Sequence, residues 1–224
     1  MSGVTYDYME QYIRELIPSN IGILDDLEKF ALENRVPIIQ KETAKFLQVI
    51  ITMNRPKKIL ELGTAIGYSA ILMNLALGGL NEITTIERDE KMIDIANKNI
   101  EKYGLQNKIT ILKGDCLEIL ESLQGEYDMI FMDAGKAHYN HFLPHCLRLL
   151  KKEGVLIADN VLFRGMVASK DLATRRKVTI IKRMKSYLEL VSNDNELITS
   201  VIPMGDGISV TVRKNTMSSK EEWS

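Results

Sequence analysis

The sequence predicts an α/β fold, a mostly parallel sheet of seven strands with helices on both faces. Three observations lead there: strands and helices alternate strictly from about residue 57, the strands are short apolar runs, and two β-prone runs close the chain. Apolar strands that alternate with helices are typical of a parallel sheet covered on both sides. The closing runs predict a C-terminal antiparallel hairpin.

The first 55 residues predict three helices that precede the sheet. Apolar residues recur at helical spacing over 5–17, 21–34 and 41–53, and Pro18 and Pro37 separate these segments. These helices could pack on the sheet, cover a cofactor or form a dimer surface, and the sequence leaves the three alternatives open.

Residues 56–214 predict the core of a single domain that spans 1–224. The expected strands are 57–62, 82–87, 108–113, 127–132 and 153–158. The expected helices are 67–78, 89–103, 115–123, 138–151 and 172–190. The hairpin strands 196–202 and 208–213 flank the turn-forming run Pro203–Gly207. A polar tail, 215–224, ends the chain.

Composition narrows the class of protein. With 45% apolar and 26% charged residues the chain is typical of globular proteins, and a net charge of −1 gives no overall nucleic-acid signature. Two cysteines make no disulfide framework. No apolar run reaches the ~18–20 residues of a membrane span, and the N-terminus lacks the form of a signal peptide. We therefore expect a cytoplasmic protein with no membrane contact.

The first strand of the core runs into a glycine turn, Gly63-Thr64-Ala65-Ile66-Gly67, that opens a helix. Gly63 allows a backbone conformation that a Cβ would obstruct. A helix N-terminus at the carboxyl edge of a parallel sheet is the usual nucleoside-cofactor site. The spacing G-x-x-x-G lacks the third glycine of the dinucleotide fingerprint, which favours a cofactor without a pyrophosphate. A purely structural turn would show the same two glycines.

Carboxylates follow the next four strands, at Glu87, Asp115, Asp133 and Asp159-Asn160. Glu87 is placed to accept hydrogen bonds from a ribose diol. Asp115 could reach an adenine amino group or cap the helix that follows. Asp133, Asp159 and Asn160 offer hard oxygen ligands from adjacent strands, which suit Mg²⁺ or a similar cation. Three histidines, at 138, 141 and 145, are interpreted as helix-surface or core residues.

Together these residues resemble the metal-dependent class I O-methyltransferases of the catechol and caffeoyl-CoA type, over about residues 36–213. The motifs that carry the resemblance are Glu61–Ser69, Glu87, Asp133–Lys136 and Asp159–Leu162. It implies a Rossmann-like class I methyltransferase fold and a catalytic lysine, Lys136. It implies S-adenosylmethionine at Ile39, Gly63, Thr64, Tyr68, Ser69, Glu87, Asp115, Cys116 and Asp133. It also implies a divalent cation, Mg²⁺ or another, on Asp133, Asp159 and Asn160.

Within that family the chain is most similar to the branch that methylates wobble 5-hydroxyuridine of bacterial tRNA to 5-methoxyuridine. The motifs are Val36–Ile39, Pro56–Leu60, Asn160–Arg164 and Ile202–Gly207. The implied partner is a tRNA anticodon stem-loop. Basic residues that could hold its phosphates are Arg164, Arg175, Arg176, Lys182 and Arg183. A solvated helix face would carry similar charges.

Two alternatives stay open. A methyltransferase of catechol-like phenols would use the same core, because catechol and 5-hydroxyuracil chelate one metal in the same way. A non-enzymatic nucleoside-binding protein would not need Lys136 together with the three oxygen ligands. We also expect a homodimer.

Overall fold

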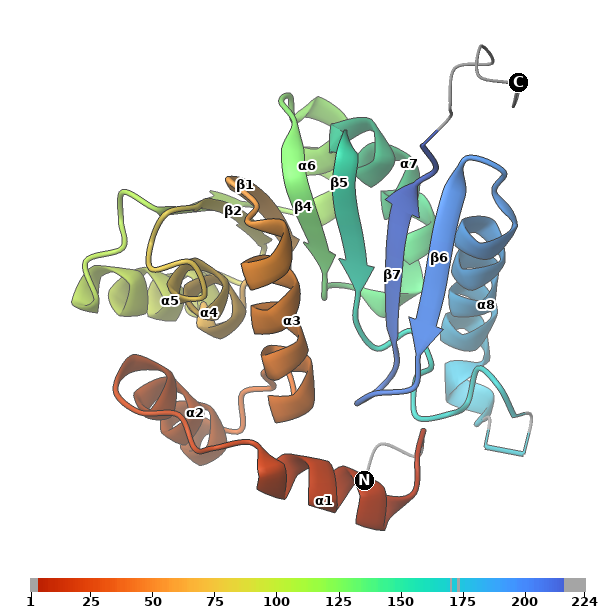
Figure 1. Ribbon diagram of the computed structural model, residues 1–224, viewed down its shortest axis with the longest axis horizontal. Coiled ribbons are helices and arrows are strands. Elements are labelled where there is room, and N and C mark those ends of the chain that lie inside the picture. The colour runs from red at the N-terminus through yellow and green to blue at the C-terminus, as the bar shows by residue number, and fades with distance from the viewer. Residues whose placement is uncertain (1–3, 170, 173, 216–224) are drawn as a thin grey trace, which may run out of the picture.

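The computed structural model describes residues 4–169, 171–172 and 174–215. Its sheet has seven strands in the order β3-β2-β1-β4-β5-β7-β6 (Figure 1). The strands are β1 (Lys58–Leu62), β2 (Glu82–Glu87), β3 (Ile109–Lys113), β4 (Tyr127–Met132), β5 (Leu150–Ala158), β6 (Leu197–Ile202) and β7 (Ile208–Arg213). Strands β1 to β5 pair in parallel, and β7 is antiparallel to both β5 and β6. The predicted fold class is confirmed.

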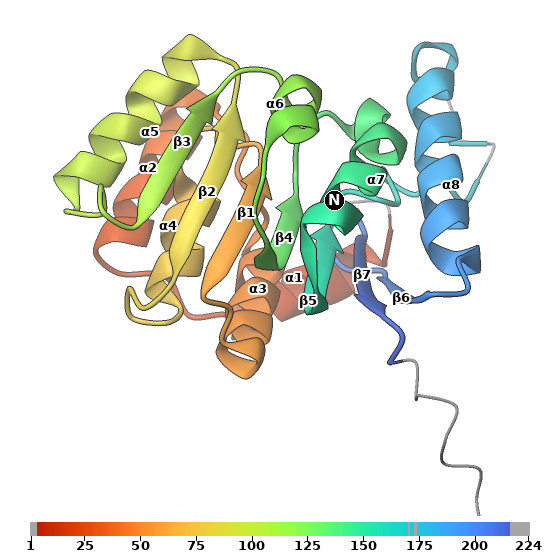
Figure 2. The same ribbon diagram turned by 90° about the horizontal axis from the view of Figure 1, so that it is seen from above.

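Helices cover both faces of this sheet (Figure 2). They are α1 (Asp7–Leu16), α2 (Ile23–Asn34), α3 (Lys41–Asn54), α4 (Tyr68–Leu75), α5 (Glu90–Lys102), α6 (Cys116–Ser122), α7 (Tyr139–Leu149) and α8 (Val178–Asn193). Two short 3-10 helices are η1 (Lys136–His138) and η2 (Arg175–Lys177).

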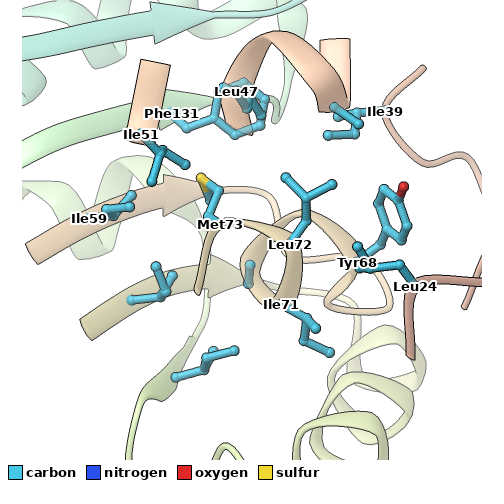
Figure 3. Close-up of a cluster of buried hydrophobic side chains, with 14 of the residues drawn as sticks. Leu24, Ile39, Leu47, Ile51, Ile59, Tyr68, Ile71, Leu72, Met73 and Phe131 are labelled. Carbon is cyan, nitrogen blue, oxygen red and sulfur yellow. The ribbon is translucent and has the colours of Figure 1, made fainter. Parts of the chain in front are cut away.

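Neighbouring strand residues enter two different cores, because successive side chains of a strand point to opposite faces. Met129 and Phe131 of β4 pack with helices α2 to α5, and part of this cluster is shown in Figure 3. Ile130 and Met132 of the same strand pack with α6, α7 and α8. Burial on both faces explains why the strands read as continuous apolar runs rather than alternating ones.

The three N-terminal helices do not share one role. Leu27 of α2 and Leu47 of α3 are buried in the first core, where both helices pack against α4. Helix α1 instead lies across the carboxyl edge of the sheet, near the β6–β7 turn (Figure 1). Its apolar residues Tyr8, Tyr12 and Leu16 are exposed. Helix α1 is therefore held mainly by polar contacts.

Two predicted helix boundaries are wrong. The helix expected over 138–151 ends at Leu149, and β5 begins at once with Leu150, which pairs with Tyr127. Helical spacing of leucines runs through both residues, so the pattern concealed the change. The helix expected over 172–190 begins only at Val178, after the separate turn η2. The predicted polar tail, 215–224, lies outside the described residues except for its first position.

In the described part of the chain, no helix combines the length and the apolar character that crossing a bilayer requires.

The β6–β7 turn holds the segment that follows β5. Val161 donates its N–H to the Gly207 carbonyl at 2.9 Å, and Leu162 donates to the Asp206 carbonyl at 2.9 Å. Gly207 has φ +90°, and a Cβ there would overlap the Leu162 side chain. Only glycine satisfies both the backbone conformation and this close approach. The turn therefore fixes the residues directly after Asp159 and Asn160.

We expect Gly207→Ala to lower the free energy of unfolding by about 3 kcal/mol, because left-handed strain and steric overlap add. Gly104→Ala is the matched control, since Gly104 also has a positive φ but has nothing within 4 Å of its added Cβ. The free energy of unfolding of the control should fall only by the cost of left-handed backbone strain, about 1–2 kcal/mol. Urea unfolding of both variants measures the difference, and equal losses would contradict the steric contact.

Candidate functional site

A cavity of about 580 Å³ opens at the carboxyl edge of the sheet. That size is ordinary for a small-molecule site. Its lining includes every residue predicted to bind the cofactor or the cation, and the predicted catalytic lysine: Ile39, Gly63, Thr64, Tyr68, Ser69, Glu87, Asp115, Cys116, Asp133, Lys136, Asp159 and Asn160. The structure thus brings these residues together, and their individual roles stay predictions.

The glycine turn allows β1 to approach the end of β4 closely. Gly63 has φ +98°, and a Cβ there would lie 2.9 Å from the Asp133 carbonyl oxygen. Gly67 also has a positive φ and caps the start of α4. Both glycines are therefore required by backbone geometry, and α4 begins beside the cavity.

Glu87 is held by the backbone around the turn. Its carboxylate accepts N–H groups from Ala65 at 3.0 Å, Arg88 at 2.9 Å and Asp89 at 3.0 Å. These bonds orient the carboxylate at the cavity wall. Asp115 accepts the Leu117 N–H at 2.9 Å as the cap of α6. Asp115 therefore caps α6, as one of the two predicted roles requires, and its contact with an adenine stays a prediction.

Sequence reasoning assigned no role to Glu61, which lies behind this wall. Its carboxylate is fully buried and accepts the Thr85 hydroxyl at 2.6 Å, and Thr85 in turn contacts the hydroxyl of Thr64 at 2.7 Å. Burial raises the pKa of Glu61 to about 7. A charged residue inside an apolar strand was the available signal, because such residues are rarely buried without a specific reason.

Asp133, Asp159 and Asn160 come from the ends of the neighbouring strands β4 and β5. Asp159 is 2% exposed and Asp133 lines the cavity. Burial, followed by the charge of Asp159, raises the pKa of Asp133 well above its usual range, and burial raises that of Asp159 to about 6. Asn160 has φ +62° and donates its backbone N–H to Asp159 at 2.6 Å.

These residues fit a hard divalent cation. Two adjacent carboxylates withdrawn from water are costly unless a positive charge compensates them, and oxygen donors suit Mg²⁺. Within residues 4–169, 171–172 and 174–215, no group of three or more His, Cys, Asp or Glu side chains is arranged to hold a metal. The predicted set has only two carboxylates, with an amide as its third member.

Lys136 begins η1 directly after Gly135, which has φ +52°. Its Nζ lies 3.9 Å from Asp206 Oδ2 and 5.9 Å from the centre of the Phe163 ring. Neither neighbour was predicted as a site residue. The topology contained a signal for Asp206: β6 runs in the same direction as β5, so the turn after β6 must lie at the carboxyl edge.

The predicted RNA-binding residues fall into two groups. Arg164, Arg175, Arg176 and Lys182 are exposed. Arg183 is half-buried and donates from Nη1 to the Ala137 carbonyl at 3.1 Å, so it braces η1 from α8. Lys177, at 5.1 Å from the Phe163 ring centre, connects η2 to the segment that follows β5. The four exposed residues form what we call the basic surface: Arg164, Arg175, Arg176 and Lys182. This surface thus adjoins the part of the cavity that contains Lys136.

Comparison with known proteins identifies the family of this chain. Residues 16–214 match the family model described as O-methyltransferase. A catechol O-methyltransferase of Niastella koreensis is 33% identical over 194 residues, which cover 84% of this chain and 87% of that protein. A caffeoyl-CoA O-methyltransferase of Populus kitakamiensis is 29% identical, covering 77% of this chain and 76% of that protein.

Solved structures of methyltransferases have the same fold as this chain. A Staphylococcus aureus crystal structure, provisionally named a caffeoyl-CoA O-methyltransferase, superposes with a TM-score of 0.85 at 34% identity, over 93% of this chain and 100% of that one. The SAH-bound methyltransferase PaMTH1 of Podospora anserina has a TM-score of 0.84 at 23% identity, over 93% and 95% of the two chains, and shows the shared fold. The family match covers most of the chain and includes the whole cavity wall, and the chain therefore belongs to the O-methyltransferase family.

Proposed function

We propose that this chain is an S-adenosylmethionine- and divalent-metal-dependent O-methyltransferase that converts wobble 5-hydroxyuridine of tRNA to 5-methoxyuridine. One observation carries the chemistry: Asp133, Asp159, Asn160 and Lys136 line the same cavity as the glycine turn and Glu87. A cofactor site and a site for a hydroxyl nucleophile thus share one volume. The SAH-bound structure of the same fold supports the cofactor assignment.

In this proposal the turn and Glu87 bind the nucleoside part of S-adenosylmethionine, with Glu87 accepting from the ribose. Methyl transfer is an in-line displacement: the C–O bond forms as the C–S bond breaks, and the thioether product leaves. The protein must chiefly align the substrate oxygen with the methyl group. The cavity wall is suited to that task because sheet ends, rather than long loops, carry the residues.

Asp133, Asp159 and Asn160 would hold the cation, whose charge, when it is bound, makes a nearby substrate hydroxyl more acidic. In this proposal Lys136 accepts the proton of that hydroxyl as a general base. Asp206, 3.9 Å from Lys136 Nζ, would then stabilise the ammonium that results. The proton therefore moves from the hydroxyl to Nζ while the methyl group moves to the oxygen.

The RNA part of the proposal is supported by four exposed basic residues beside the cavity: Arg164, Arg175, Arg176 and Lys182. Phosphate contacts of this kind bind RNA without affecting the reacting oxygen. The second candidate is a methyltransferase of catechol-like phenols, favoured by the name of the 33% identical relative. A non-enzymatic nucleoside-binding role is the weakest candidate, because binding a nucleoside does not require Lys136 or the three oxygen ligands. The homodimer and the cytoplasmic location stay predictions.

Replacing Glu87 should specifically weaken the binding of the cofactor. We expect Glu87→Ala to cost ~1–3 kcal/mol of S-adenosylmethionine affinity, the scale of hydrogen bonds to a charged group. Glu82→Ala is the control, because Glu82 is exposed at the opposite end of the same strand. Calorimetry that found the same affinity in both variants would remove Glu87 from the ribose.

Activity should require a divalent cation. Exhaustive EDTA treatment should abolish methyl transfer, and Mg²⁺ should restore it. Mg²⁺ should also raise the melting temperature of the wild type, because a ligand of the native state stabilises it by mass action. Asp159→Asn should lose both the activity and this Mg²⁺-dependent shift while remaining folded. Full activity of the chelated wild type would rule out the metal.

The basic surface should separate RNA from small substrates. Neutralising Arg164, Arg175, Arg176 and Lys182 together should raise KM for tRNA steeply and leave methylation of free 5-hydroxyuridine or catechol nearly unchanged. The slope of log affinity against log salt should flatten by about one unit per lost phosphate contact. Arg183 is left intact because it braces η1.

The control for this test neutralises four basic residues on other surfaces: Lys45, Lys58, Lys91 and Lys98. It should leave the tRNA KM and the salt slope unchanged. Equal losses on tRNA and on catechol in the first variant would favour the small-phenol candidate.

A further inference from the structure

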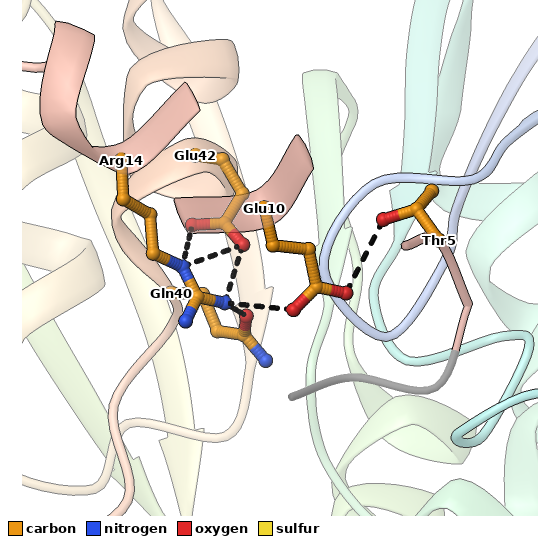
Figure 4. Close-up of polar contacts among 5 residues, drawn as sticks. All are labelled: Thr5, Glu10, Arg14, Gln40 and Glu42. Atoms are coloured by element: carbon orange, nitrogen blue, oxygen red, sulfur yellow. Dashed lines mark hydrogen bonds and ion pairs between the residues drawn. The ribbon is translucent and has the colours of Figure 1, made fainter. Parts of the chain in front are cut away.

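One arginine ties helix α1 to the entrance of the cavity. Arg14 Nε donates to both carboxylate oxygens of Glu42, at 3.1 and 3.0 Å, and Nη2 donates to Glu42 Oε1 at 2.7 Å (Figure 4). Glu10 lies 3.8 Å from the same guanidinium. The side chains of Glu42 and Glu10 are only 4% and 6% exposed. Buried carboxylates need such a partner, so Arg14 is fixed in place.

The same guanidinium orients Gln40. Arg14 Nη2 donates to Gln40 Oε1, and Figure 4 shows the amide nitrogen turned away from the arginine. A guanidinium carries donors only, so the amide oxygen of Gln40 must face it and the amide NH₂ must point elsewhere. On another side, a Cβ added to Gly205 in the β6–β7 turn would lie 3.7 Å from Gln40 Oε1. The Gln40 amide is therefore held between α1 and this turn.

Gln40 lines the same cavity as Lys136, Asp159 and Asn160. Within the described ranges no acceptor receives a hydrogen bond from its amide nitrogen, although Oε1 is engaged. Arg14 thus orients a side chain of the cavity wall, and among the residues that the structure describes the two Gln40 N–H donors have no acceptor.

We propose that Gln40 is a substrate-binding residue that donates to a carbonyl oxygen of the substrate ring, and that Arg14 is the positioning residue that orients it. This inference rests on the proposed function and makes it more specific. A 5-hydroxyuracil ring carries carbonyl oxygens, whereas a catechol ring carries none. Gln40 would therefore favour the pyrimidine over the phenol by direct contact, independently of the phosphate contacts.

The decisive variant is Gln40→Glu, which preserves shape and keeps an oxygen toward Arg14 but removes both N–H donors. We expect KM for the 5-hydroxyuridine nucleoside to rise about tenfold or more, since a hydrogen bond is lost and an acceptor is left facing an acceptor. The kcat, the KM for catechol and the calorimetric affinity for S-adenosylhomocysteine should stay within twofold.

Gln48→Glu is the matched control. Gln48 lies on α3 outside the cavity, and its Oε1 also accepts from a cation, Lys45 Nζ, at 2.7 Å. The chemical change is identical, and all constants should equal those of the wild type.

Arg14→Lys tests the positioning role. Lysine keeps a cation beside Glu42 and Glu10 but cannot serve Glu42 and Gln40 with one planar fork. We expect a smaller rise in the nucleoside KM with no change for catechol. In the double variant with Gln40→Glu the two effects should not add, because both act through one contact. Additive effects would contradict the positioning role.

A binding measurement separates this inference from the proposed function. The side-chain amide signals of Gln40 are assigned in a ¹⁵N spectrum by their loss in Gln40→Glu. With S-adenosylhomocysteine and Mg²⁺ present, 5-hydroxyuridine should shift these signals and catechol should not. A wild type that methylates neither compound would refute the proposed function alone. Unshifted Gln40 signals at saturating nucleoside, or an equal KM rise for catechol in Gln40→Glu, would overturn the inference.

Discussion

The site depends on a hydrogen-bond ladder that continues one residue beyond the strands. Asp133 donates its N–H to the Leu62 carbonyl at 2.9 Å, and Asp159 donates to the Met132 carbonyl at 3.0 Å. The backbone of each aspartate is therefore still part of the sheet β1–β4–β5. Gly63 permits this, because any side chain there would meet the Asp133 carbonyl. The Cα positions of the two aspartates are consequently fixed by the sheet, a condition that precise alignment of reacting groups requires.

Rigidity at this edge has an electrostatic consequence. Three carboxyl groups at this edge, those of Glu61, Asp133 and Asp159, have raised pKa values because withdrawal from water disfavours their charged forms. Such groups cost stability, and only the surrounding sheet keeps them in position. The arrangement is understandable if the charge is needed for function, since perturbed carboxylates cluster at sites that bind cations or perform chemistry.

The sequence predicted the sheet and the cavity wall well because both follow from local patterns. Apolar runs with turn residues located the strands, and parallel topology then required their carboxyl ends, with Glu87, Asp133 and Asp159, to meet. What it missed depends on contacts between distant segments. Helical spacing runs through Leu149 and Leu150, and only pairing with Tyr127 makes Leu150 a strand residue. Arg14 and Gln40 meet across 26 positions, and no periodicity signals that contact.

These two kinds of contact divide the cavity into two halves. One half, where we propose that the cofactor binds, consists of sheet ends and the glycine turn, which are fixed by backbone hydrogen bonds. The other half includes Gln40 and Lys136. Side chains position both, since Arg14 donates to Gln40 and Lys136 Nζ lies 3.9 Å from Asp206 Oδ2. Changes in these side chains can reshape the second half without disturbing the first. If the substrate binds in the second half, as we propose, one fold can keep its cofactor chemistry while relatives named for different substrates differ in that half.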